Sequence, residues 1–211
     1  MATDKIPASA SRRADAVLDA VIAAVSETGE PDVQMSDVCA RSGVALKTIY
    51  RYFTTKEQLL AAALKRWHSE VVRQTTGPVA ERSLEGLATA FLASSAQAFA
   101  ANLGMTRLMI RTLTSSSRYT TDTLQSIENE ATEELTRYLA CADPEFPGTL
   151  VWILHSWKLT IAISLARQHT DVDGATVMAK DSVAMLLRPA ATIGQKLVRT
   201  RNATTRPPTA S

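Results

Sequence analysis

The chain has 211 residues, of which 45% are hydrophobic, and it carries a formal net charge of +2 at pH 7. This length suits one domain or two small ones, and this hydrophobic content can fill a core, so a wholly disordered chain is excluded. The two cysteines, Cys39 and Cys141, have no paired spacing, which predicts a reduced protein without a disulfide in which both pack as small residues.

The N-terminal residues lack the apolar segment of a secretion signal, so we expect a cytoplasmic protein. The longest apolar stretch, from Leu150 to Ala166, contains His155 and Lys158. These polar side chains favour a buried helix over a membrane-spanning one. The sequence therefore predicts no membrane partner.

Charge is distributed unevenly along the chain. Residues 1–75 carry ten basic and nine acidic groups, residues 76–187 carry eight and twelve, and residues 188–211 carry five and none. The middle of the chain is therefore acidic. This distribution is typical of a protein that binds DNA at one end while its other domain has a different task.

Residues 1–10 are small and polar and are expected to form a flexible arm. Apolar residues then recur every three or four positions and predict a helix from Ser11 to Thr28, which Gly29 ends.

The stretch from Ser36 to Lys56 predicts a helix-turn-helix. Gly43 supplies the permissive backbone of a tight reversal between two short helices. The second of them is expected from Leu46 to Tyr52, with Ile49 facing the core. From Arg41 to Lys56 there are four basic residues and no acidic one, which predicts a surface that attracts a phosphate backbone. The four are Arg41, Lys47, Arg51 and Lys56.

The run V-A-L-K-T-I-Y-R-Y-F-x-x-K-x-x-L-L, which starts at Val44, resembles the recognition helix and the start of the next helix in the TetR family (TetR/AcrR) of bacterial transcriptional regulators. With V-Q-M at Val33 to Met35 and with Trp157, the chain also resembles the KstR-type regulators of cholesterol catabolism in actinobacteria. One feature departs from the family pattern. Gln34 and Ala45 stand near the caps of the two short helices, where Ser or Thr is common, so side-chain capping is not expected there.

The resemblance implies an all-α protein of about nine helices that is not an enzyme and needs no cofactor. A three-helix helix-turn-helix DNA-binding domain would occupy residues 11–55, and a helical effector-binding and dimerisation domain residues 56–187. Residues 188–211 hold two Pro-rich patches and five basic groups, and we expect them to form a disordered basic tail.

The expected partner of the first domain is a palindromic operator in double-stranded DNA. Lys47 and Thr48 are predicted to reach base edges. Arg51 and Lys56 are predicted to hold phosphates. The full set of predicted DNA-contacting residues is Gln34, Ser36, Leu46, Lys47, Thr48, Tyr50, Arg51, Tyr52 and Lys56.

Helical spacing continues through the second domain. Thr54 and Glu57 have the spacing of a capping box at the start of the fourth helix, which ends near Thr75. Further helices are expected from about Leu84 to Phe99, Met105 to Thr112, Leu124 to Tyr138, Thr149 to Gln168 and Asp173 to Leu187.

The helix predicted from Thr149 to Gln168 is apolar nearly all round, so it needs cover on two sides. We expect one cover to be a second copy of the chain, and the resemblance implies a two-helix face that forms a four-helix bundle across a two-fold axis. The predicted interface residues are Lys158, Ile161, Ala162, Leu165, Met178 and Met185.

The resemblance also implies a pocket for a small apolar or amphipathic effector, and the KstR-like features imply a lipid or steroid CoA thioester. The candidates combine apolar walls with a few polar anchors. They are Trp67, Phe91, Phe99, Met105, Arg107, Met109, Arg111, Trp152 and His155. A plain role in the core remains the alternative for each of them, which for His155 means a buried histidine with satisfied hydrogen bonds.

These features predict a homodimeric, ligand-responsive transcriptional repressor. His68, His155 and His169 are far apart in the sequence, and no metal-ligand spacing or Gly-rich phosphate loop occurs, so the sequence predicts neither a metal site nor a catalytic centre. The alternative is a helical enzyme or lipid-binding protein on the same scaffold without DNA binding. Such a protein would not need the basic outer face of Leu46 to Tyr52.

Overall fold

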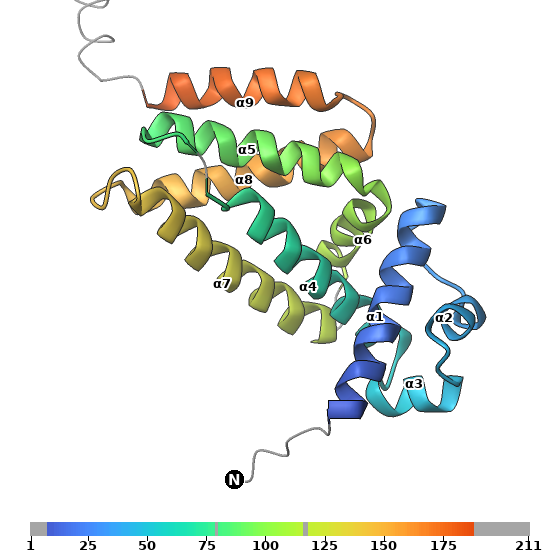
Figure 1. Ribbon diagram of the computed structural model, residues 1–211. Helices are drawn as coiled ribbons and strands as arrows, with labels where there is room; N and C mark the ends of the chain where they lie inside the picture. Colours follow the sequence, from blue (N-terminus) through green and yellow to red (C-terminus); the bar gives the residue numbers. More distant parts are fainter. Residues whose placement is uncertain (1–7, 79, 116–117, 188–211) are drawn as a thin grey trace, which may run out of the picture.

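The structure, a computed structural model, describes residues 8–78, 80–115 and 118–187. Within these ranges the chain forms nine α-helices and no strand, which confirms the predicted all-α class (Figure 1). The helices are α1 (Ala8–Thr28), α2 (Met35–Ser42), α3 (Leu46–Tyr52), α4 (Lys56–Thr75), α5 (Leu84–Ala101), α6 (Leu103–Leu113), α7 (Arg118–Ala140), α8 (Gly148–Ala166) and α9 (Val172–Leu186). The predicted tail and the first seven residues lie outside the described residues.

The first helix begins earlier than the sequence predicted. α1 starts at Ala8 rather than Ser11, so residues 8–10 are helical and the prediction of a flexible arm is wrong for them. Alanine has the highest helix propensity, and Ala8 and Ala10 extend the helix without interrupting its pattern.

The cap of α4 is shifted by one residue from the prediction. The Thr55 side chain accepts a hydrogen bond from the Gln58 backbone N–H at 3.0 Å. The Gln58 side-chain oxygen accepts one from the Thr54 backbone N–H at 2.6 Å. The predicted pair of Thr54 and Glu57 is therefore wrong. Both threonines precede an acid or amide at the required spacing, so the pattern could not decide between them.

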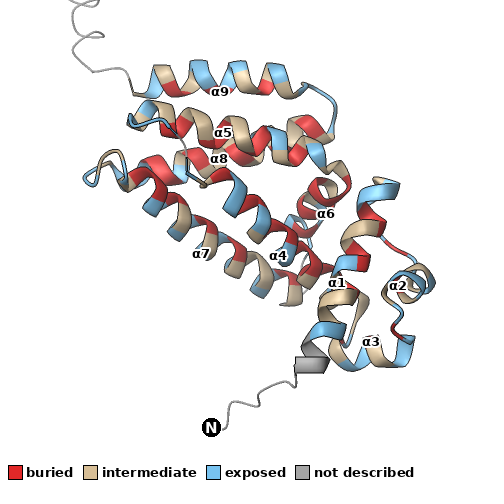
Figure 2. Ribbon diagram, viewed as in Figure 1, coloured by how far each residue is buried: buried red, intermediate tan, exposed pale blue. Residues whose placement is uncertain are grey.

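The helices form a head and a body (Figure 1). The head is α1 to α3, and the body is α4 to α9. α4 runs from the head into the body, where it packs along α7 and α5. At the far side α5 packs against both α8 and α9. The apolar stripes of these helices face one another, and the outer faces are exposed (Figure 2).

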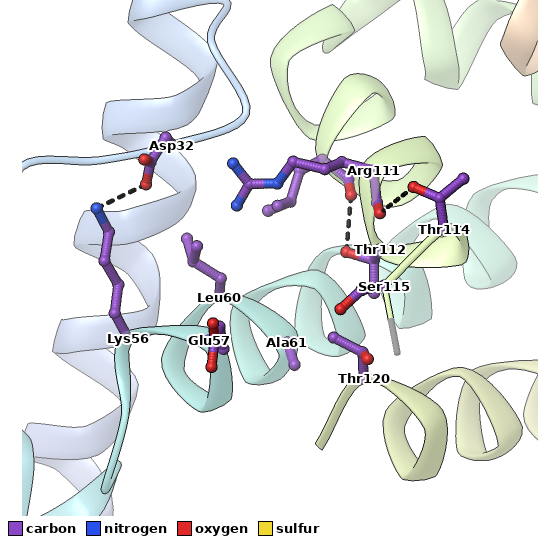
Figure 3. A pocket seen from close by; sticks show the side chains of 11 residues that line it. Asp32, Lys56, Glu57, Leu60, Ala61, Arg111, Thr112, Thr114, Ser115 and Thr120 are labelled. Carbon is purple, nitrogen blue, oxygen red and sulfur yellow. Dashed lines mark hydrogen bonds and ion pairs between the residues drawn. The ribbon is translucent and has the colours of Figure 1, made fainter. Parts of the chain in front are cut away.

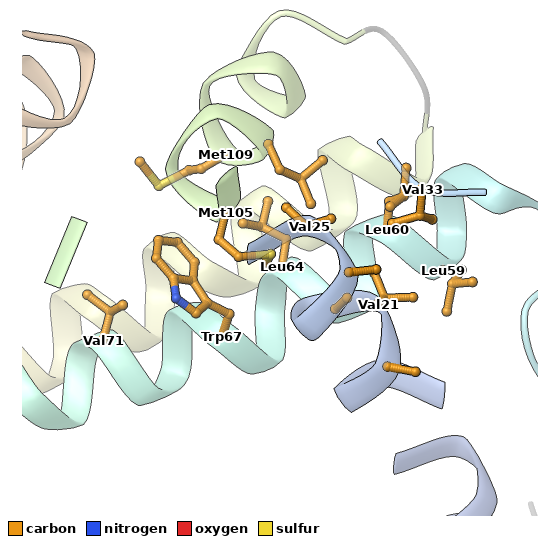
Figure 4. Packing of buried hydrophobic residues seen from close by; sticks show 14 of the residues in the cluster. Val21, Val25, Val33, Leu59, Leu60, Leu64, Trp67, Val71, Met105 and Met109 are labelled. Carbon is orange, nitrogen blue, oxygen red and sulfur yellow. The ribbon is translucent and has the colours of Figure 1, made fainter. Parts of the chain in front are cut away.

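One apolar cluster extends from the head into the body (Figure 4). It includes Val25 of α1, Leu64 and Trp67 of α4 and Met105 of α6. The Trp67 ring centroid lies 6.1 Å from that of Phe99 in α5. The head and the body therefore share one packed core.

α8 is the one helix in the described part of the chain that is long and apolar enough, by length and composition, to cross a membrane. It packs against α5, α6, α7 and α9 and buries residues along its length, among them Leu154 and Lys158. A helix at the centre of a helical core has the same composition.

The two cysteines differ in their surroundings. Both are free thiols. Cys39 is half-buried against the apolar cluster of the head, as a packing residue should be, whereas Cys141 is exposed, so the prediction that it packs is wrong. Cys141 directly follows the last turn of α7, where the chain leaves the core.

Candidate DNA-binding site and effector-binding regions

Gly43 and two buried side chains set the angle between α2 and α3. Gly43 ends α2 in the left-handed conformation with φ of 64°, which side chains other than glycine rarely adopt. Val44 and Ile49 are 8% and 0% exposed and fix α3 to the core of the head. Gln34 and Ala45 stand at the N-caps, and neither makes a side-chain cap, as the sequence predicted.

The outer face of α3 holds the largest part of the predicted DNA-contacting set. Lys47 and Arg51 are exposed, and the large apolar side chains of Leu46 and Tyr50 are 45% and 41% exposed. The half-buried members are Thr48, Tyr52 and Lys56, and the two from the start of α2, Gln34 and Ser36, are exposed.

Arg51 and Tyr52 also contact each other. The Arg51 guanidinium carbon lies 5.4 Å from the centroid of the Tyr52 ring, and Tyr52 is partly buried against the apolar cluster. Stacking on an anchored ring restricts the guanidinium, so less conformational entropy is lost when it meets a phosphate.

Two of the four basic residues counted in this segment form ion pairs. Arg41 pairs with Asp37 at 2.9 Å and with Glu27 at 2.8 Å. Lys56 Nζ lies 2.7 Å from Asp32 Oδ1 (Figure 3). The hydrogen bond with Arg41 lowers the pKa of Glu27. Glu27, Asp32 and Asp37 all precede the segment from Arg41 to Lys56, so counting charges within that segment alone overstated its free positive charge.

A polar pocket of about 630 Å³ lies between the head and the body (Figure 3). It contains Lys56, predicted to hold phosphate, and Arg111, predicted to bind effector. Its lining is Asp32, Lys56, Glu57, Leu60, Ala61, Leu108, Arg111, Thr112, Thr114, Ser115 and Thr120. Burial opposes ionisation of the Asp32 carboxyl. The hydrogen bonds from Lys56 and from the Val33 N–H, with the positive charges of Lys56 and Arg111, outweigh this effect and lower its pKa.

The start of α6 is fastened to the end of α1. Asn102 caps α6 through its side-chain oxygen, and its Nδ2 donates to Ser26 Oγ at 2.7 Å. Gly104 packs so closely that a Cβ there would lie 2.1 Å from the Val25 carbonyl oxygen. The sequence argument missed this junction, although an asparagine and a glycine around the start of a helix were a visible signal.

The predicted effector residues do not line one pocket. Phe91, Phe99 and Met105 are at most 2% exposed and fill the core, and Met109 is also buried. The others lie apart. Trp67 contributes to a groove between α1, α4 and α7, while Trp152 and His155 belong to a pocket between α7 and α8.

Arg107 and Trp152 have other surroundings than the prediction gave them. Arg107 Nη1 donates to the Gly29 carbonyl at 2.9 Å, so its guanidinium joins the body to the head. Trp152 is 72% exposed on α8. His155 has an Nε2 atom without a hydrogen-bond partner among the described residues, so the alternative of a satisfied core histidine is wrong.

Half of the predicted dimer interface is inside the chain. Lys158, Ala162 and Leu165 are 7%, 0% and 5% exposed, so these three predictions are wrong for a surface between two copies. They share the buried side of α8 with Leu150, Val151 and Leu154. Ile161 is half-buried. Met178 and Met185 of α9 are 62% and 69% exposed, and Val177 beside them is 60% exposed.

These features define a class of protein. A three-helix head presents a short helix with exposed basic, hydroxyl and aromatic side chains, and a helical body is packed firmly against that head. This arrangement is that of a helix-turn-helix head joined to a helical body.

Comparison with known proteins gives the family. Residues 17–63 match the family described as bacterial regulatory proteins, tetR family. The chain is 39% identical over 69 residues to the HTH-type transcriptional repressor KstR of Rhodococcus jostii and 44% identical over 59 residues to that of Mycobacterium tuberculosis. These alignments cover 33% and 28% of this chain and 32% and 27% of the two relatives.

The likeness to solved structures extends over the body. A TetR transcriptional regulator from Rhodococcus sp. RHA1 has a TM-score of 0.65 at 21% identity, over 84% of this chain and 97% of that one. FadR from Bacillus subtilis in complex with stearoyl-CoA has a TM-score of 0.63 at 14% identity, over 82% and 97%. At these identities the likeness concerns the fold. Residues 17–63 are therefore similar to the DNA-binding region of the TetR family, and the described chain as a whole is similar to solved TetR regulators in fold.

Proposed function

We propose that the protein is a cytoplasmic, homodimeric transcriptional repressor that binds a palindromic operator and leaves it when a small amphipathic effector binds. The observation that carries this proposal is the outer face of α3. Leu46, Lys47 and Tyr50 are exposed on a helix that buries Ile49 completely. These side chains have no role in the core, and their chemistry suits base edges and thymine methyl groups in a major groove.

The test of DNA binding is titration of the protein with its own upstream DNA at several salt concentrations. Phosphate contacts from both heads of a dimer should give a steep fall of affinity with salt. A random duplex of equal length is the control for sequence preference. Absence of binding at low salt would favour the alternative of a helical enzyme or lipid-binding protein without DNA binding.

Exposed apolar residues on α8 and α9 support the dimer. Trp152, Val177, Met178 and Met185 are each at least 60% exposed, which is unusual for such large apolar side chains on a soluble surface. A two-fold axis through this face would bring the same residues of two copies together. The operator half-sites should then lie about one DNA turn, or ~34 Å, apart or slightly more.

The family fold and the junction between body and head support release by an effector. FadR, of the same fold, binds stearoyl-CoA, which makes an acyl compound a reasonable first class to test. A hundredfold loss of operator affinity needs about 2.7 kcal/mol of coupling, and the operator must weaken effector binding by the same factor. Equal effector affinity with and without operator would contradict this part of the proposal.

A further inference from the structure

A lysine and two histidines meet inside the body. Lys158 Nζ lies 3.4 Å from Nε2 of His68 in α4, and His155 precedes Lys158 by three positions on α8. The Phe91 ring contacts both ends of this group. Its centroid is 5.8 Å from Lys158 Nζ and 6.2 Å from the centroid of His155. Lys158 and His68 are only 7% and 2% exposed.

Lys158 is a buried cation without a counter-ion in the described part of the chain. None of the ion pairs found there includes it. Burial lowers the pKa of Lys158 to about 8, so the side chain is still mostly charged at neutral pH. A charge buried without a partner is strongly destabilising, and clustered perturbed groups are more typical of binding sites than of structural cores.

The two histidines have ring nitrogens without partners. An ammonium can only donate, so Lys158 donates to Nε2 of His68 and the neutral ring carries its proton on Nδ1. This Nδ1 atom and Nε2 of His155 are buried and have no hydrogen-bond partner among the described residues. Burial keeps the pKa of His68 well below 6.5 and lowers that of His155 to about 4. The cluster therefore holds one positive charge and the His68 Nδ1–H donor without an anion to accept from them among the described residues. The neutral His155 ring hydrogen-bonds the Ala131 backbone, so its Nε2 offers only a lone pair.

His155 also lines a surface pocket of about 400 Å³ between α7 and α8. Phe146, Val151 and Trp152 make much of its wall apolar. The exposed Glu128 carboxylate lies at the same pocket, so a ligand with several phosphates outside the pocket would meet a negative charge. An apolar tail with a single anionic group that reaches inward fits this distribution of charge.

We propose that Lys158 and His68 bind the carboxylate of a small amphipathic acid whose tail lies in the pocket between α7 and α8. This names the chemistry of the effector and so rests on the proposed function. The carboxylate supplies acceptors to the ammonium and to the His68 Nδ1–H. His155 is the member of the cluster that lines the pocket, and the proposal requires its ring to turn so that the carboxylate can reach Lys158. A neutral ester or thioester would leave the charge of Lys158 uncompensated.

The test compares decanoic acid, methyl decanoate and decanoyl-CoA as ligands of the full chain by calorimetric titration. The acid should bind at least tenfold more tightly than either of the others. Lys158→Met should lose this preference, because the anchoring charge is gone. Lys65→Met, which removes an exposed lysine of α4, should retain it.

The wild-type comparison alone can overturn the proposal, since equal affinity for the acid and its methyl ester would leave no role for Lys158. An acid preference that survives Lys158→Met would also overturn it. Operator binding is measured on the same samples to separate the two proposals. If the protein binds the acid but no operator, the carboxylate site at Lys158 is supported and the proposed repressor function is contradicted. Release from the operator by decanoyl-CoA and not by decanoic acid keeps the function and contradicts the anion site.

Discussion

The Arg107 guanidinium of α6 donates a hydrogen bond to the backbone carbonyl of Gly29, at the end of α1, over 2.9 Å. It crosses the junction between the body and the head. Asn102 and Gly104 hold the same junction from the start of α6. The head is therefore positioned by α6 as well as by α4, which gives a displacement in the body a second route to the recognition helix.

Gly104→Ala should destabilise the protein, because the added Cβ would lie 2.1 Å from the Val25 carbonyl oxygen, a backbone atom that cannot turn aside. Forced separation of two packed helices costs about 1–3 kcal/mol. Urea denaturation measures the loss. Gly148→Ala is the matched control, since nothing lies within 4 Å of a Cβ at that position. Equal stability of the two variants would mean that α6 does not hold α1 in this way.

Two substitutions on α3 should separate base contacts from phosphate contacts. Thr48→Ala should change the preference among operator variants with little change in the salt dependence of binding. Arg51→Ala should weaken binding to all sequences and lower the salt slope by about one. Lys65→Ala, on α4, is the control for loss of a charge away from the head. Fluorescence anisotropy at several salt concentrations gives both quantities, and a reversed pattern would exchange the two assigned roles.

The ion pair between Lys56 and Asp32 competes with any phosphate that Lys56 holds. Asp32→Asn should therefore strengthen DNA binding more than Glu30→Gln does, although both remove one exposed acid from the same loop. In the Lys56→Ala background the extra gain should disappear, because no lysine is left to release. A gain that persists there would mean that Asp32 acts only through its general charge and that Lys56 is not a phosphate contact.

The short helices of the head could be predicted from sequence because their signals are local. The Gly43 turn and the burial of Ile49 set α3, and its predicted ends match the structure. The pairs of Arg41 with Glu27 and of Lys56 with Asp32 could not be predicted, since these acids come from α1 and from the loop before α2. The pair of Arg41 with Asp37 is local, because the two residues are four apart on α2.

The buried face of α8 could not be predicted from the sequence for a different reason. A helix that is apolar nearly all round has no amphipathic phase, so its sequence does not tell which face is inside. Ala162 was assigned to the outer side for this reason, although it is completely buried within the body. The position of Lys158 reverses the usual rule that charges face outward, and only the packing of α4 and α5 around it reveals the cluster.

Met178→Glu should split the proposed dimer, because the side chain is 62% exposed beside other large apolar residues. The two introduced glutamates would face one interface across the two-fold axis, where they would repel each other and lose their contact with water. Sedimentation should show a monomer that no longer binds the operator tightly. Gln125→Glu adds the same charge on α7, away from this face, and should stay dimeric. A wild type that is monomeric at micromolar concentration would contradict the assignment.

Lys158→Met should stabilise the free protein at pH 7. Burial lowers the folded-state pKa of Lys158 from 10.5 to about 8, a difference worth roughly 3 kcal/mol. Below pH 8 both the folded and the unfolded chain carry this proton, and the folded state bears the whole cost of the buried charge. Between pH 8 and pH 10.5 the unfolded chain binds more protons, so wild-type stability should rise with pH there. The advantage of Lys158→Met, about 1–3 kcal/mol at pH 7, should therefore shrink towards pH 10.5.

Urea denaturation of both proteins at pH 7 and pH 10 measures this change, with Lys65→Met as the exposed control. An advantage for Lys158→Met that is the same at both pH values would mean that Lys158 is not buried as a charge.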